Sequence, residues 1–143
     1  MKLLFISILS LITGLSFGQA PKHANQIIVE GVSYNQVLSA LTDDGYFIDK
    51  KDNDLQTVFT VARVANQTTH TTIKNIYSTI TNVVFYVRVK DSVAYISGRF
   101  NMDMDGMREY EAIQNMGGMY KAGWQAMDNF AESLKGKVDY VKN

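Results

Sequence analysis

The chain of 143 residues contains no cysteine, one proline and two histidines. The absence of cysteine excludes disulfide bonds, thiol nucleophiles and cysteine-ligated metal sites. Both histidines, His23 and His70, lie in polar segments, and neither has a neighbour that would orient it as an acid, a base or a metal ligand. We therefore expect both to be surface residues.

An excess of charge of either sign is also missing, because 14 Lys and Arg residues balance 14 Asp and Glu residues. Nucleic-acid-binding proteins gain most of their affinity by neutralising phosphates, and polybasic membrane binders depend on the same excess of Lys and Arg. The composition favours neither class. Residues 19–143 also contain no G-x-S-x-G or S-x-x-K motif. We expect a protein that is not an enzyme and that needs no cofactor.

The one long apolar run lies at the N-terminus, where Lys2 precedes the nearly unbroken apolar segment Leu3–Leu15. Ser16 and Gly18 then place small residues at positions −3 and −1 of a cleavage site. This pattern is typical of a signal peptide. The run is too short to span about 30 Å of hydrocarbon comfortably, which argues against a membrane anchor.

We therefore expect a signal peptide over residues 1–18 and a single α+β domain over residues 19–143. Cleavage after Ala20 is the nearby alternative. The mature protein would be periplasmic or secreted, and the chain has no cysteine to carry a lipid after the cut.

Hydrophobic periodicity predicts two helices. Apolar residues recur at i, i+3, i+4 and i+7 over Tyr34–Leu41, after a capping box at Ser33–Gln36 and before Gly45, which suits a helix C-terminus. A second stripe with the same spacing covers Met116–Leu134, and Gly136 is placed to end it.

Runs rich in β-branched and aromatic residues predict the strands. They are Gln26–Glu30, a strand beginning at Tyr46–Asp49, Leu55–Val64, Val83–Val89 and Val93–Met102. The order is β-α-β-β-β-β-α, which predicts an α+β fold: an antiparallel sheet of four to six strands with both helices on one face.

Two segments leave alternatives open. The polar, Thr-rich segment Ala65–Asn82 is read as a long connection with some extended structure, although Ile73, Ile76 and Ile80 also fit a short helix. The C-terminal residues 138–143 fit either a short strand or a tail.

The last two strands predict a hairpin that turns near Asp91 and Ser92. Pairing about this turn places Val87 opposite Ile96 on the core face, since residues alternate between the two faces of a sheet. The opposite face carries the candidate binding residues, Tyr86, Arg88, Tyr95 and Arg99. Tyr and Arg are enriched at interaction hot spots, but they also serve cross-strand packing on a solvated face.

Asn101, Asp103 and Asp105 occupy positions 1, 3 and 5 of a possible calcium loop, and a glycine follows. Ala112 stands where that loop needs a bidentate Glu, so a solvated turn explains the same residues and we expect no metal site. A metal-dependent hydrolase that uses Asp103, Asp105 or Glu109 is the least favoured function, because these carboxylates have no partner to tune their pKa.

Six of the seven methionines gather near the second predicted helix. Such a cluster is typical of an adaptable core. A small apolar ligand carried between the sheet and this helix is the alternative.

Four segments together resemble a known family. They are the Ser-Phe-Gly-Gln end of the signal peptide, IIVEGVSYNQVLSAL, GYFIDKKDNDLQT and VRVKDSVAYISGRFN. These segments resemble small exported proteins of Bacteroidota that carry an uncharacterised domain with a TATA-binding-protein-like fold. The resemblance implies that fold and carries over no catalytic residue. The name of the fold implies no DNA binding, because a fold does not determine function.

The absence of a catalytic set, together with an open sheet face, predicts a non-catalytic binding or interaction module of the cell envelope. Its partner would be an envelope or secreted protein.

Overall fold

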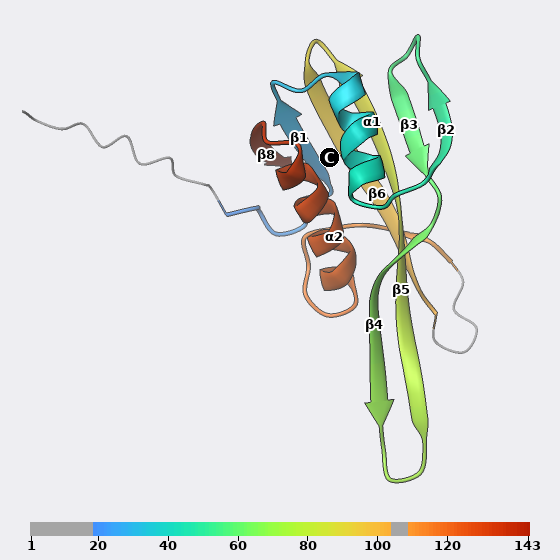
Figure 1. The fold of residues 1–143 in the computed structure, drawn as a ribbon. Helices are drawn as coiled ribbons and strands as arrows, with labels where there is room; N and C mark the ends of the chain where they lie inside the picture. The colour runs from blue at the N-terminus through green and yellow to red at the C-terminus, as the bar shows by residue number, and fades with distance from the viewer. Residues whose placement is uncertain (1–18, 104–108) are drawn as a thin grey trace, which may run out of the picture.

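The computed structural model describes residues 19–103 and 109–143, so the predicted signal peptide (residues 1–18) and Asp105 lie outside the described residues. Figure 1 shows a twisted antiparallel sheet with two helices packed on one face. The helices are α1 (Tyr34–Asp43) and α2 (Tyr120–Ser133). The strands are β1 (Gln26–Glu30), β2 (Ile48–Asp52), β3 (Thr57–Thr60), β4 (Arg63–Thr71), β5 (Ile76–Lys90), β6 (Val93–Asp103), β7 (Glu111–Ala112) and β8 (Lys137–Val141).

The strands follow the order β2-β3-β5-β6-β1-β8, and every pairing is antiparallel. β3 and β4 pair with successive stretches of β5, and β7 pairs with β6. The prediction of an α+β fold with an antiparallel sheet is confirmed. The prediction of four to six strands is wrong, because the sheet over the described residues has eight.

The hairpin of β5 and β6 has the predicted register. Val87 lies opposite Ile96, and the pairing continues without a shift from Lys90 to Ile80. Asp91 and Ser92 form a two-residue turn, and both have positive φ angles of 53° and 61°. A turn with φ > 0 at both central residues matches the twist of the flanking strands, which explains how so short a loop closes the hairpin.

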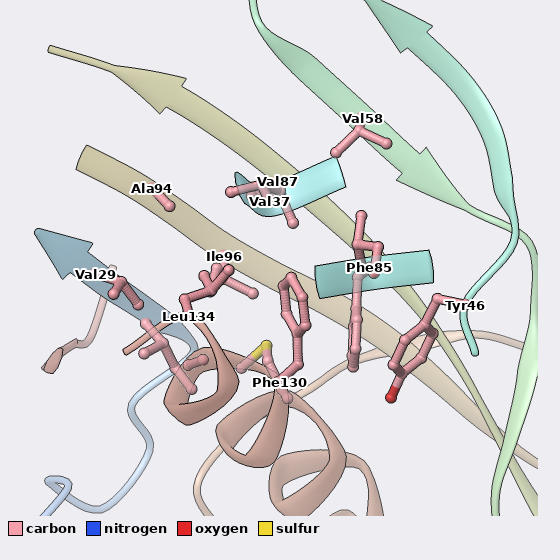
Figure 2. Close-up of a cluster of buried hydrophobic side chains, with 14 of the residues drawn as sticks. Val29, Val37, Tyr46, Val58, Phe85, Val87, Ala94, Ile96, Phe130 and Leu134 are labelled. Carbon is pink, nitrogen blue, oxygen red and sulfur yellow. The ribbon is translucent and has the colours of Figure 1, made fainter. Parts of the chain in front are cut away.

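A single buried cluster lies between the sheet and the helices (Figure 2). The inward side chains of β5 and β6 meet Val37 and Leu41 of α1 and Phe130 of α2 in this cluster. The rings of Phe130 and Phe85 stack with their centroids 5.7 Å apart, and Tyr46 packs on both. The core therefore fixes which face of the sheet the helices cover and leaves the other face open.

The capping box predicted for α1 is confirmed. The Gln36 side chain accepts a hydrogen bond from the Ser33 amide at 2.7 Å, and the Ser33 hydroxyl accepts one from the Gln36 amide at 3.3 Å. Gly45 follows the helix with a φ of +79°, a conformation that glycine adopts without steric cost.

The predicted boundaries need three corrections. Leu55–Val64 is two strands rather than one, since β3 ends at Thr60 and β4 begins at Arg63. The segment Ala65–Asn82 is not a connection, because it holds most of β4, a turn and the first half of β5. The element order β-α-β-β-β-β-α is therefore wrong. Of the two alternatives for the C-terminus, the strand is the one that forms, since β8 pairs with β1.

β4 and the first half of β5 form an arm that projects from the body of the domain (Figure 1). Solvent reaches both faces of β4, so polar side chains occupy both of its faces and the alternation that marks a half-buried strand is missing. His70 stacks on Tyr77 across the arm with ring centroids 4.8 Å apart. This stacking adds a side-chain contact to the backbone pairing of the two strands.

β8 is held against α2 by Tyr140. Its ring packs on Trp124 at a centroid distance of 5.9 Å, and its hydroxyl donates a hydrogen bond to Asp128 at 2.9 Å. Burial, followed by this hydrogen bond, raises the pKa of Tyr140 to about 12.

Over the described ranges, neither helix has the length and apolar character that crossing a bilayer requires.

Replacing Phe130 with alanine should lower the free energy of unfolding by about 3–5 kcal/mol, because the side chain is fully buried between two aromatic rings. Urea denaturation measures this change. Phe47→Ala is the matched control, since Phe47 is 78% exposed and should change stability by less than about 0.5 kcal/mol. A loss below about 1 kcal/mol for Phe130→Ala would contradict the assignment of the core face.

Candidate functional site

The sheet face opposite the helices brings the four predicted binding residues together. Arg88 of β5 lies directly opposite Tyr95 of β6. Tyr86 lies two residues before Arg88 on the same face and opposite Ser97, and Arg99 lies opposite Val84. Directly opposed side chains are about 5 Å apart at their Cβ atoms, and diagonal neighbours are about 7–8 Å apart. All four side chains therefore lie within reach of a single bound surface.

Phe59 of β3 belongs to the same surface and was not predicted from the sequence. It lies opposite Tyr86, the two rings are 4.6 Å apart between centroids, and Phe59 is 45% exposed. The alternation along β3 could have placed Phe59 on this face, because Val58 and Thr60 point inward and Phe59 points outward. We call Phe59, Tyr86, Arg88, Tyr95 and Arg99 the open-face cluster.

The two arginines of the open-face cluster are exposed to solvent. Residues 19–103 and 109–143 contain a single ion pair, in which Lys137 Nζ lies 3.4 Å from Glu30 Oε2. Neither Arg88 nor Arg99 thus meets a carboxylate in the described parts of the chain. Both guanidinium groups can pair with a carboxylate on another molecule, in the two-point geometry that arginine favours.

The two tyrosines are half-buried, and their rings lie among the side chains of neighbouring strands. Tyr95 has Arg88 on one side and Ile28 of β1 on the other. Ordered aromatic rings of this kind present apolar area without losing much side-chain freedom on binding. The cluster thus combines rigid aromatic surface with two solvated cations.

The candidate metal residues do not form a described ligand set. The Asn101 side chain accepts a hydrogen bond from Asn82 at 3.1 Å, and Asp103 ends β6. Asp105 lies outside the described residues. Where the structure describes the chain, no three His, Asp or Glu residues gather closely enough to hold a metal ion.

The space between the sheet and α2, where an apolar ligand was the alternative prediction, is occupied by core side chains. Met127 is fully buried there, beside Phe130, while Met119 lies at the start of α2 with its side chain exposed. A cavity of about 640 Å³ does border α2, on the side that faces β4. Its lining combines polar side chains, among them Arg63, Lys121 and Gln125, with alanine, valine and aromatic residues, and no methionine contributes to it.

No protein-family model matches this chain, and no match is found among curated proteins.

Proposed function

We propose that the protein is an exported, non-catalytic interaction module that binds a protein partner through the open-face cluster. The observation that supports this most strongly is the register of β5 and β6, which gathers Tyr86, Arg88, Tyr95 and Arg99 on the face that the helices leave uncovered. The resemblance to exported Bacteroidota proteins with a TATA-binding-protein-like fold belongs to the same proposal.

The energetics of such a surface favour binding to a protein. Tyr and Arg are the residues that most often dominate the free energy of protein–protein association. A sheet presents them with little backbone entropy left to lose, so a larger share of the contact energy appears as affinity. The stacked pair of Phe59 and Tyr86 adds apolar area next to the two cations.

The chemistry of the open-face cluster also describes its partner. The rings of Tyr86 and Tyr95 need an apolar surface, and Arg88 and Arg99 need carboxylates placed beside that surface. We therefore propose a partner in the envelope or outside the cell that presents an apolar patch bordered by Asp or Glu.

Export is the part of the proposal that rests on the sequence alone. The mass of the intact protein isolated from the envelope or the medium should correspond to a chain that begins at Gln19, or at Pro21 if cleavage follows Ala20. A mature protein that retains residues 1–18 would contradict export by a cleaved signal peptide.

Site-specific photo-crosslinking tests the binding surface. A photoreactive amino acid at Ser97, which lies opposite Tyr86 on the open face, should give a discrete adduct with one protein, to be identified by mass spectrometry. The same group at Thr42, an exposed position on α1, should not give this adduct. The double change Arg88→Glu and Arg99→Glu should abolish the Ser97 adduct, because it turns both attractions into repulsions.

Lys74→Glu with Lys142→Glu is the charge-matched control, since it changes the net charge equally at two exposed positions away from the open face. This control should leave the adduct intact. Because Arg88 and Arg99 are exposed, the test variant should also keep its melting temperature within about 4 °C of the unmodified protein. An adduct that survives the arginine reversal, or no adduct at Ser97, would contradict the proposal.

A further inference from the structure

A polar groove runs between α2 and the base of the arm, on the helix-covered side of the sheet and away from the open-face cluster. Lys121, Gln125 and Asn129 line it from α2 at spacings of four residues, so they form one stripe about 12 Å long on the helix surface. Arg63 and Asn66 line it from β4. Its volume of about 640 Å³ lies within the range of small-molecule sites.

Arg63 occupies an unusual place for a charged residue. It lies opposite Val83, at a register position whose side chains point to the core face of the sheet. Its guanidinium group lies over the Tyr46 ring at 4.6 Å from the centroid and donates a hydrogen bond from Nη1 to the Asp44 carbonyl oxygen. These two contacts fix the orientation of the cation at the wall of the groove.

The groove offers more hydrogen-bond donors than acceptors. Arg63 has five N–H donors, one of which binds Asp44, and Lys121 adds three more. The one carboxylate in the lining, that of Asp44, already accepts a hydrogen bond from the Ser133 hydroxyl at 2.8 Å. The lining therefore carries one net positive charge and is complementary to a ligand rich in acceptors.

We propose that this groove binds a small organic oxyanion, with its carboxylate or phosphate held by Arg63. The side-chain amides of Gln125 and Asn129 provide donors and acceptors for the uncharged polar groups of the same ligand. The groove is much larger than a free phosphate ion, so the ligand carries an organic body that extends along α2 toward Lys121. The fixed guanidinium lowers the entropic cost of binding, because little of its freedom remains to be lost.

Three sugars with the same ring test the proposal by an NMR titration of the backbone amides of the mature chain. Glucuronate carries a carboxylate, glucose 6-phosphate carries a phosphate, and glucose carries neither. At least one of the two anions should shift the amides of Lys121, Gln125 and Asn66 with a dissociation constant of about 1 mM or tighter. Glucose should shift none of them. A response to only one anion identifies the carboxylate or the phosphate as the group recognised.

Arg63→Gln should weaken binding of the responding anion at least about tenfold, since a charge-assisted pair is lost. Lys121→Gln is the second variant. Lys121 lies on the exposed surface of α2, so its replacement leaves the contact between Arg63 and Tyr46 intact. This variant should weaken binding about threefold or more. Lys142→Gln, which removes the same charge elsewhere, should leave binding unchanged. No shift of the groove amides with either anion, equal shifts with glucose, or full affinity in Lys121→Gln and Arg63→Gln would overturn the proposal.

Discussion

β5 and β6 pair along eleven register positions, from Ile80 and Asp103 to Lys90 and Val93, and a two-residue turn closes them. This pairing determines the face on which each of their side chains lies, because a shift by one residue would exchange the two faces. Phe85, Val87 and Ile96 then point to the helices, and the tyrosines and arginines point away from them. The core and the open-face cluster thus depend on the same register.

The length of β5 explains the rest of the architecture. Its fifteen residues extend past the end of β6, so its first residues pair only with β4 within the described part of the sheet, and the arm results. Where the arm leaves the body, the buried positions on the core face of β5 change from apolar Val83 to Thr81 and Thr79. Arg63 lies at this transition, which is why a charged residue occupies an inward register position and borders a groove rather than the core.

The features that were predictable from the sequence are those in which one face is buried. β5 and β6 alternate apolar and polar residues around Asp91 and Ser92, so their register could be derived, and the capping box at Ser33 marked the start of α1. β4 was missed because solvent covers both of its faces, which removes the alternation.

Phe59 and Arg63 were missed for a different reason. Each belongs to its site through a neighbour distant in the chain, Tyr86 for Phe59 and Tyr46 for Arg63. Periodicity within one segment reports which face a residue occupies, but it does not report which strands lie side by side. The groove depends on the packing of α2 beside β4, and neither the existence of β4 nor this packing could be derived from local pattern.

The core and the open-face cluster both depend on the pairing of β5 with β6, so this pair should be the most stable part of the molecule. Native-state hydrogen exchange tests it directly. The amides within Val83–Val89 and Ala94–Phe100 should exchange only through global unfolding, with the free energy that urea denaturation gives, while those of Thr69–Ser78 in the arm should exchange by local opening at a much lower free energy. Equal protection in the two regions, or faster exchange in the β5–β6 pair than in the arm, would contradict the account.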